Sequence, residues 1–507
     1  MSENSNKKIA KNTVILYLRL FVTMLVSLYT SRIVLQVLGV QDYGTYTIVG
    51  GIVALFSFLN NAMTTATQRF LNFELGKKNL SGATRIFSMS LTTHVSIGIM
   101  LIILGETLGL WFLNTQINIP AERMLAANWV YQFSLLSFFV KIIRTPYQAS
   151  IVAFEKFSFY AFAGIIEVAL TLFVAFVLKF TQYDKLIIYG GLLFVVTVII
   201  NLTYWIYCRL KLEICHYKFF WNKSLYFELI SFSGWSLFGS VANIGAQQGL
   251  NILVNIFYGV VVNAAMGIAN QVTTAINSFV SNFQLAFNPQ IVKSYAANDK
   301  EQFMSLVFRT SKYSYFLLFL ISLPILLSMD YLLNIWLDNV PEYAAIFCQL
   351  MLIFCLTDAI AAPLWMSVQA IGQIRNYQLI ISTIIFLNLP LSYIVLKLGY
   401  PVESVLYIRI FVNIVAFLFR IIYLQKKIQL NASQYIKDVV LRTIVVSLLS
   451  VIIPLVLKNY IDNNSIIGFI LMTVSSILCT GLAIYLLGLN KHEKMFIKHT
   501  LLNKLRR

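Results

Sequence analysis

Apolar stretches long enough to cross a lipid bilayer follow one another along almost the whole sequence. A bilayer core requires about 20 mainly apolar residues per helix. Only 11% of the 507 residues are charged, against roughly 25% in soluble domains, which excludes a soluble globular protein. We therefore predict an all-α polytopic membrane protein with about fourteen transmembrane helices, at residues 13–38, 44–66, 86–112, 125–153, 157–179, 185–208, 229–257, 262–288, 304–329, 343–370, 374–396, 402–424, 438–458 and 465–488.

The net charge of +18 would suggest a nucleic-acid partner in a soluble chain. In a membrane protein, Lys and Arg in short loops instead fix the orientation of the helices. With a cytoplasmic amino terminus, 28 of the 38 cations fall in inward-facing segments, five in outward-facing segments and five within spans. This bias predicts two cytoplasmic termini, no nucleic-acid partner and a first span that serves as its own insertion signal.

A faint internal repeat has an offset of 220 residues. Residues 38–46, with the span that ends in residues 66–79, are echoed by residues 258–266 and 286–299. Six crossings separate the copies, so the repeats would be parallel, as in many transporters. The predicted organisation is a cytoplasmic amino terminus (1–12), an N-lobe of six spans (13–211), a cytoplasmic linker (212–228), a C-lobe of six spans (229–425), two further spans (438–488) and a basic cytoplasmic tail (489–507).

Polar side chains form a stripe on the eighth span. At 100° per residue its six members lie within about 40° of Asn270 on one helix face; they are Asn270, Thr274, Asn277, Ser281, Gln284 and Asn288. The seventh span adds further amides, together with Gly245 and Gly249, which allow close packing or a bend for gating. Interhelical hydrogen bonds can explain single amides, whereas the whole stripe favours a water-filled central cavity that binds a polar substrate.

Five cations fall within spans, namely Arg19, Arg32, Lys141, Arg144 and Arg409. Each costs about 2.5–3.5 kcal/mol on insertion scales. Arg32, Lys141 and Arg144 can alternatively reach a headgroup region with their charged ends. The acids available inside, mainly Glu167 and Asp358, are too few to neutralise the cations. A net positive interior suits a large anion such as phosphate or pyrophosphate.

Motifs of other chemistries are missing from the sequence. GxxxxGK[ST], GxSxG and HExxH do not occur, so we expect no catalytic residues, no enzyme activity and no ATP hydrolysis by the chain itself. The five cysteines form no CxxC pair, which predicts neither a metal site nor a cofactor. His94, the one histidine within a span, is either a packed residue or a titrating one.

Two short motifs carry a resemblance to a known family. Ser31-Arg-Ile-Val-Leu-Gln-Val-Leu-Gly-Val-Gln-Asp-Tyr-Gly-Thr-Tyr46 combines an Arg late in the first span with Leu-Gly and Tyr-Gly in the following loop, and Thr67-Gln-Arg-Phe70 closes the second span. The chain resembles bacterial polysaccharide flippases of the Wzx or polysaccharide-transporter type. They belong to the superfamily that includes multidrug and toxic-compound extruders and lipid II flippases.

This resemblance implies a transporter of the bacterial cytoplasmic membrane that flips a polyprenyl-diphosphate-linked oligosaccharide by alternating access. The glycan would be a repeat unit of O-antigen, capsule or exopolysaccharide, and a polysaccharide polymerase and assembly proteins are possible partners. Arg32 and Asp42 match positions of the family motif, which implies a gating role for Asp42. A gradient of H⁺ or Na⁺ could drive transport, with Asp358, Glu167 and His94 as ion-coupling candidates. Two alternatives stay open, a cation-coupled multidrug exporter and a non-transporting partner of polysaccharide assembly.

Overall fold

A computed structural model describes residues 3–54, 57–115, 119–337, 340–461, 465–490 and 493–495. Regular structure within these ranges is helical throughout, as predicted. Most of the basic tail, including Lys491, Lys498, Lys504, Arg506 and Arg507, lies outside the described residues, so the predicted tail is not described.

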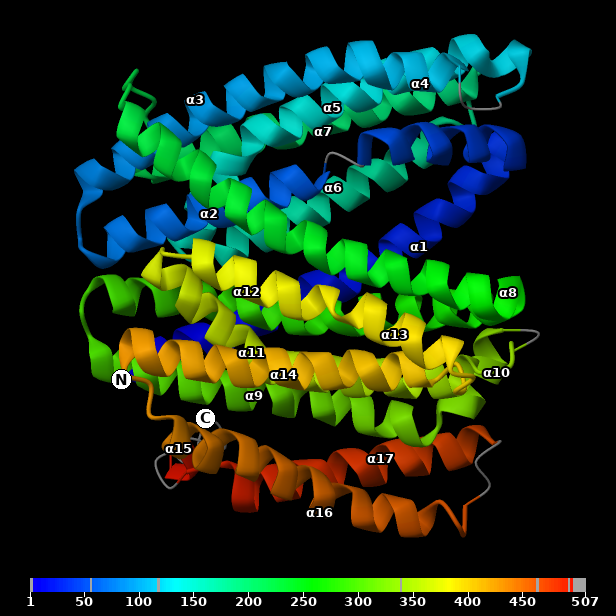
Figure 1. Ribbon diagram of the computed structural model, residues 1–507. Helices are drawn as coiled ribbons and strands as arrows, with labels where there is room; N and C mark the ends of the chain where they lie inside the picture. Colours follow the sequence, from blue (N-terminus) through cyan, green and yellow to red (C-terminus); the bar gives the residue numbers. More distant parts are fainter. Residues whose placement is uncertain are drawn as a thin grey trace, which may run out of the picture. The chain divides into compact units, whose positions relative to one another are not determined.

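The first of two compact units comprises residues 1–240 and 285–299. In it α5 packs against α1, α2, α3 and α7 and forms the centre, while α6 packs against α1 and α7 (Figure 1). Its helices are α1 (Glu3–Ala54), α2 (Ser57–Gly76), α3 (Leu80–Leu104), the π-helical turn η1 (Gly105–Gly109), α4 (Leu110–Thr115), α5 (Ala121–Ala153), α6 (Phe157–Val177), α7 (Lys185–Lys211), the 3₁₀ turn η2 (Glu213–Cys215) and both ends of α8 (Lys223–Ala296).

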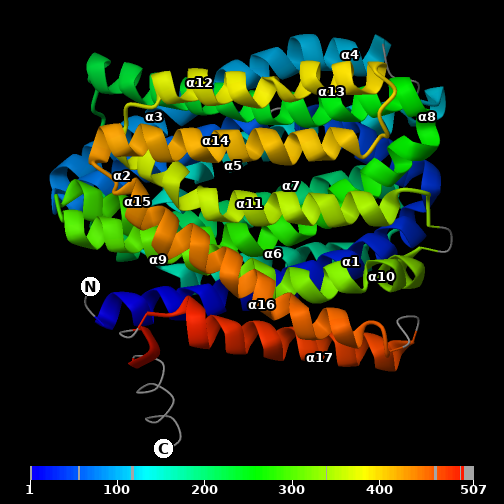
Figure 2. The same cartoon turned by 60° about the horizontal axis from the view of Figure 1, so that its bottom comes forward.

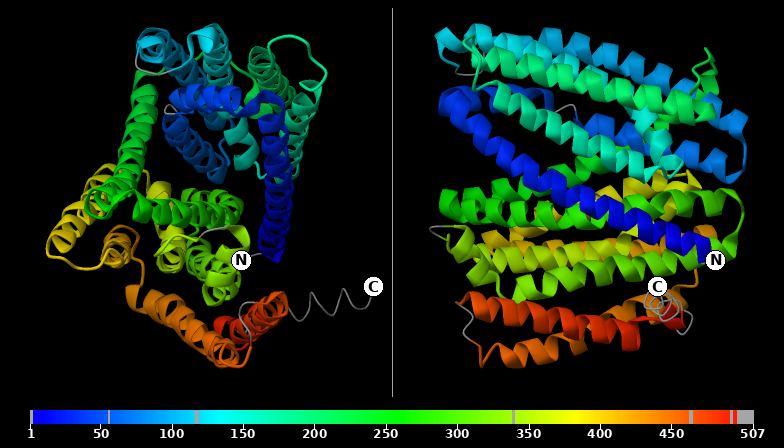
Figure 3. Two further views of the ribbon diagram at one scale, coloured as in Figure 1. Left: turned by 90° about the vertical axis from the view of Figure 1, so that its right-hand side faces the viewer. Right: turned by 180° about the vertical axis from the view of Figure 1, so that it is seen from behind.

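The second unit comprises residues 241–284 and 300–507. Its core lies where α11 packs against α9 and α14 (Figure 2), and α16 and α17 form a pair of adjacent helices (Figure 3). Besides the middle of α8 it contains α9 (Lys300–Leu327), α10 (Met329–Trp336), α11 (Ala344–Ile371), α12 (Arg375–Phe386), α13 (Asn388–Lys397), α14 (Ser404–Ile428), α15 (Ala432–Tyr435), η3 (Ile436–Leu441), α16 (Arg442–Leu457), α17 (Ile466–Ala483) and η4 (Ile484–Gly488).

The fourteen predicted spans correspond to helical segments of the described residues. Eleven helices there are long and apolar enough to cross a membrane. The three other predicted spans fall on the two parts of α8 and on the segment from the end of α1 through α2. Together with the many exposed large apolar side chains, which would be costly in water, this identifies a multi-pass membrane protein.

Two glycines interrupt the longest helices at equivalent places. Gly39 (φ 78°, ψ 169°) lies inside α1 and Gly259 (φ 77°, ψ −170°) inside α8, and both of these helices change direction along their length (Figure 1). Such a backbone conformation is open almost only to glycine. The two positions are 220 residues apart, which is the offset of the predicted repeat.

The turns that follow repeat the same geometry. Lys78 and Asn298, again 220 residues apart, have φ of 57° and 56°, and the next helices begin at Leu80 and Lys300. The amides around both turns bond to carbonyls in the same pattern, Asn79 N to Glu74 O at 2.9 Å and Asp299 N to Ser294 O at 3.1 Å. The internal repeat expected from a weak sequence signal is therefore a repeat of backbone structure.

A buried ion pair anchors the described end of the chain in the second unit. Glu493, 7% exposed, accepts a 2.9 Å hydrogen bond from Lys312 of α9, which is 2% exposed. The amide of Asn490 donates to the same carboxylate at 2.7 Å. Burial acts to raise the pKa of Glu493, but these donors outweigh it and leave the pKa lowered. Glu493 is therefore held as a carboxylate against α9.

Candidate functional site

A cavity of about 450 Å³ lies within the first unit. Its walls come from α1, α2, α5, α6 and α7, so the centre of this helix bundle is hollow on one side of α5. Ser134, Ser137 and Lys141 recur at intervals of three and four on α5 and therefore share a face. Thr171 of α6 and Thr197 of α7 add hydroxyl groups. The lining is thus polar on several sides, in the middle of apolar helices.

Two charged side chains line this cavity, Lys141 and Glu167. Glu167 of α6 pairs with Arg144 of α5, whose Nη1 lies 3.5 Å from the carboxylate. Among the described residues Lys141 forms no ion pair, although Glu167 attracts it electrostatically at longer range. The polar group thus contains two cations and one acid, and the Lys141 ammonium remains uncompensated at short range.

Arg19 of α1 lies beside the same group of residues. Its guanidinium stacks over the ring of Tyr160, 4.4 Å from the ring centre, and it fills the space that Gly164 leaves open, because a Cβ there would collide with it. Its Nε is buried and has no hydrogen-bond partner among the described residues. Arg144 approaches the Tyr204 ring at 5.3 Å, and both arginines act electrostatically on Tyr204. Arg19 and Arg144 are therefore brought together, as neighbours of the cavity.

The structure places Arg32 and His94 apart from this group. Arg32 is exposed on α1, thirteen residues and hence about 20 Å along the helix from Arg19. His94 of α3 is 2% exposed, and its Nδ1 lies 2.6 Å from the carbonyl oxygen of Ser90. Its Nε2 is buried without a partner among the described residues. His94 is thus a packed histidine that retains one unused ring nitrogen.

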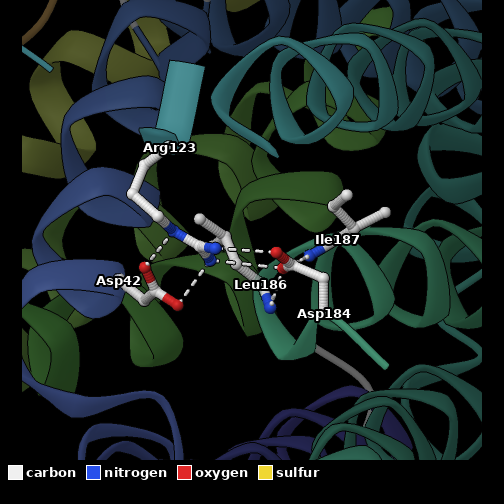
Figure 4. Close-up of polar contacts among 5 residues, drawn as sticks. All are labelled: Asp42, Arg123, Asp184, Leu186 and Ile187. Atoms are coloured by element: carbon white, nitrogen blue, oxygen red, sulfur yellow. Dashed lines mark hydrogen bonds and ion pairs between the residues drawn. The ribbon is translucent and has the colours of Figure 1, made fainter. Parts of the chain in front are cut away.

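Asp42 belongs to a separate group of charges in the first unit (Figure 4). Arg123, at the start of α5, donates to both Asp42 oxygens at 2.7 and 2.6 Å and to Asp184 at 2.7 and 3.2 Å. Asp184 also caps α7 by accepting from the amides of Leu186 and Ile187. Burial acts to raise the pKa of Asp184, but these hydrogen bonds outweigh it and leave the pKa lowered. One arginine thus connects three chain segments.

One member of the predicted polar stripe, Asn270, belongs to a chain of hydrogen-bonded amides within the second unit. Asn270 accepts from Gln247 at 3.1 Å and donates to Asn251 at 3.2 Å, and Asn251 donates to Gln248 at 3.0 Å. The chain of amides joins the two parts of α8 on either side of Gly259. Asn270 is therefore explained by hydrogen bonds between the two parts of α8, which is the alternative considered for single amides.

The other predicted residues of α8 have different surroundings. Asn277 and Gln284 are partly exposed further along the same helix. Gly245 and Gly249 lie in regular helix and pack against neighbours, since a Cβ would lie 3.7 Å from Phe386 and 2.6 Å from Leu389. Within the described part of α8, the departure from helical geometry lies at Gly259, ten residues beyond Gly249.

A second group of charges lies between α11 and α14. Arg409 contacts Phe354, 4.3 Å from the ring centre, and Met351 Sδ at 3.4 Å. Arg420 is 9% exposed and its Nε donates to Tyr377 Oη at 3.0 Å. Eleven residues separate the two arginines, so they lie within about 20° of the same helix face. Asp358 of α11 attracts both electrostatically, and again one acid faces two cations.

Comparisons with solved structures establish the fold. A MATE crystal structure in the bent conformation superposes with a TM-score of 0.73 at 13% identity, over 85% of this chain and 96% of that one. An outward-facing multidrug resistance MATE family transporter of the MOP superfamily gives 0.72 at 13% identity, over 84% and 96%. The chain has the MATE fold. No protein-family model and no curated protein matches the sequence.

A third protein with the MATE fold has a different pocket. It is a MOP superfamily transporter from Pyrococcus furiosus, described as having a binding pocket of reverse polarity that suggests a different function. Its TM-score is 0.69 at 14% identity, over 84% of this chain and 96% of that chain. Proteins with the MATE fold thus differ in the polarity of their pockets.

Sequence reasoning missed two residues of these groups. Arg420 is not among the five cations that the sequence pattern places within spans, yet it is buried. Its spacing of eleven residues from Arg409 was the available signal. Arg123 is not singled out by the sequence either, because no local pattern indicates that Asp42 and Asp184, 81 and 61 residues away, are its partners.

Proposed function

We propose that the protein is a transporter that flips a polyprenyl-diphosphate-linked oligosaccharide across the bacterial cytoplasmic membrane by alternating access. The excess of cations over acids in both groups of intramembrane charges carries this proposal. Arg19, Lys141 and Arg144 accompany Glu167 in the first unit, and Arg409 and Arg420 accompany Asp358 in the second. Because a charge within the membrane that lacks a partner is costly, such an excess is explained by an anionic substrate.

The chemistry of the two groups suits the parts of such a substrate. Guanidinium groups form strong bidentate hydrogen bonds with phosphate oxygens, which fits the diphosphate. Hydroxyl and amide side chains pair with the hydroxyls of sugars. Glu167 and Asp358 are the acids through which a gradient of H⁺ or Na⁺ would be coupled in this proposal, and His94 is the third candidate.

A second candidate function is the export of small cationic drugs. The names of the structural neighbours favour it, and the likeness of fold supports a drug exporter and a lipid flippase equally. The polarity of the intramembrane groups favours the flippase, because a site for cations would carry more acids than bases.

Proteoliposomes containing the purified protein distinguish the two functions. A fluorescent polyprenyl-diphosphate disaccharide is placed in both leaflets, and the fraction accessible to a membrane-impermeant quencher is followed with time. We expect flipping by the wild type and a rate about tenfold lower for Arg19→Gln and Arg409→Gln, since each removes charge-assisted hydrogen bonds to the diphosphate. Lys397→Gln, at an exposed cation at the end of α13, is the matched control.

Transport of ethidium is measured in the same vesicles. Ethidium transport without lipid flipping, accelerated by Arg19→Gln, would reject the flippase and favour the drug exporter. Absence of both activities would favour a non-transporting role in polysaccharide assembly.

A further inference from the structure

We propose that the cavity of the first unit is a subsite for a single acidic sugar, a hexuronate or a residue of equivalent charge, in the transported glycan. This inference rests on the proposed function and adds the charge of the glycan, which the proposed function leaves open.

The size of the cavity fits part of a glycan. Small-molecule sites occupy roughly 300–1,000 Å³, and about 450 Å³ lies at the lower end of that range. A sugar ring fits such a volume, whereas a complete repeat unit with its lipid does not. The cavity thus suits one part of the substrate, with the remainder outside it.

The lining matches the surface of a sugar ring. Ser134 and Ser137 present hydroxyl groups, which can donate and accept hydrogen bonds. The hydroxyls of Thr171 and Thr197 donate to carbonyls of their own helices and offer acceptor oxygens to a ligand. Tyr46 and Tyr189 contribute two aromatic rings whose centres are 4.8 Å apart. Polar groups at the edges beside an apolar ring face suit a molecule that has hydroxyls around its rim and C–H groups on its faces.

The charges of the lining select an acidic sugar over a neutral one. Glu167 is already paired with Arg144, while Lys141 faces the cavity without an ion pair among the described residues. An ammonium in this position gains a partner when a carboxylate enters, and charge-assisted hydrogen bonds are the strong ones. A neutral sugar would leave the Lys141 charge uncompensated.

The same charges disfavour the diphosphate in this cavity. A diphosphate carries more than one negative charge, and Glu167, a lining residue, repels each of them. Arg19 and Arg144, which both act electrostatically on Tyr204, set two guanidinium groups against the single carboxylate of Glu167, whereas Lys141 in the cavity supplies one cation against that same carboxylate. The arginines therefore suit the diphosphate, and the cavity suits a sugar that carries a single charge.

Two lipid-linked probes test the inference in proteoliposomes. They are polyprenyl-diphosphate disaccharides that differ only in the terminal sugar, glucuronate in one and glucose in the other. The measured quantity is the ratio of their initial flipping rates, in which any general loss of transport cancels. We expect Lys141→Gln to lower the acidic-to-neutral ratio about tenfold, the equivalent of one charge-assisted hydrogen bond, and Lys141→Arg to preserve most of it.

A second variant predicts the opposite change. Glu167→Gln removes a negative charge from the same lining and should raise the acidic-to-neutral ratio, so the inference stays testable if Lys141→Gln does not fold. Both rates are measured without an ion gradient, so that a loss of coupling through Glu167 affects the two probes alike. An unchanged ratio in folded Lys141→Gln or Glu167→Gln, with both probes still flipped, would overturn the subsite and leave the flippase intact. Failure of the wild type to flip either probe would overturn both.

Discussion

Arg123 holds Asp42 through two hydrogen bonds, one to each oxygen of the carboxylate. Asp42 is the third residue after the break in α1 at Gly39, and Arg123 is the third residue of α5. The pair therefore ties the part of α1 beyond the break to the central helix of the first unit. Asp184 on the other side of Arg123 adds the start of α7.

Arg123→Gln should destabilise the first unit. The variant leaves the carboxylates of Asp42 and Asp184 close together without the cation between them, and we expect a loss of about 1–2 kcal/mol, since the group is partly exposed but bidentate. The apparent Tm of the purified protein in detergent measures it. Lys179→Gln, at an exposed cation after α6, should leave Tm nearly unchanged, and an equal loss in both variants would contradict the role of Arg123.

Stability in acid should depend on the same contact. The pKa of Asp184 is lowered in the folded protein, so its stabilising contribution is complete above the unfolded pKa of about 3.9 and is lost as the pH falls through the folded pKa. The Tm difference between wild type and Arg123→Gln should therefore shrink from pH 6 to about pH 3. The titration of Glu493 changes the Tm of both proteins equally and therefore does not affect their difference. A difference that grows in acid would be inconsistent with this assignment.

Substitution of the two break glycines should be costly without any steric clash. A Cβ at Gly39 or Gly259 would meet nothing within 4 Å, so the cost of Gly39→Ala or Gly259→Ala is that of the backbone conformation, about 1–3 kcal/mol each. Gly44→Ala and Gly267→Ala are matched controls, because these glycines are equally uncrowded but lie in regular helix. The controls should be neutral or stabilising by about 0.5–1 kcal/mol. Similar Tm values for all four variants would refute the explanation.

Glu493→Gln should destabilise the second unit strongly. It leaves the buried Lys312 ammonium without its carboxylate, and removal of one partner of a buried pair costs about 3–5 kcal/mol. Asp438→Asn is the control, since its pair with Arg442 has the same kind of partner but is about 30% exposed on both sides. That loss should stay below about 1 kcal/mol. Thermal unfolding of both variants measures the difference, and equal losses would disprove a special role for burial.

The helical fold was predictable because its cause is local. Lipid requires about 20 apolar residues per crossing, and this requirement is visible in each of the predicted spans. The internal repeat was also predictable from the sequence, because the backbone turn requires glycine at positions 39 and 259. The sequence signal is weak because few other residues are identical in the two copies.

The details of the candidate site were less predictable because they depend on long-range packing. The helical spacing of Ser134, Ser137 and Lys141 placed them on one face, and the structure shows that this face lines a cavity. The partnership of Arg144 with Glu167 joins two helices, and no pattern within either helix specifies it. Sequence alone also could not tell that the bend of α8 lies at Gly259, while Gly249 makes room for Leu389.

The two copies of the repeat share their backbone geometry but not their charged residues. Gly39 and Gly259 have kept nearly identical torsion angles, yet the position that corresponds to Asp42 is Val262, a buried apolar residue. In the first copy, the ion pair of Asp42 holds the chain that follows the break. The second copy has no carboxylate at the corresponding position. The two halves of the chain therefore provide a natural comparison at this position, namely the same backbone turn with an ion pair in one half and with a buried apolar side chain in the other.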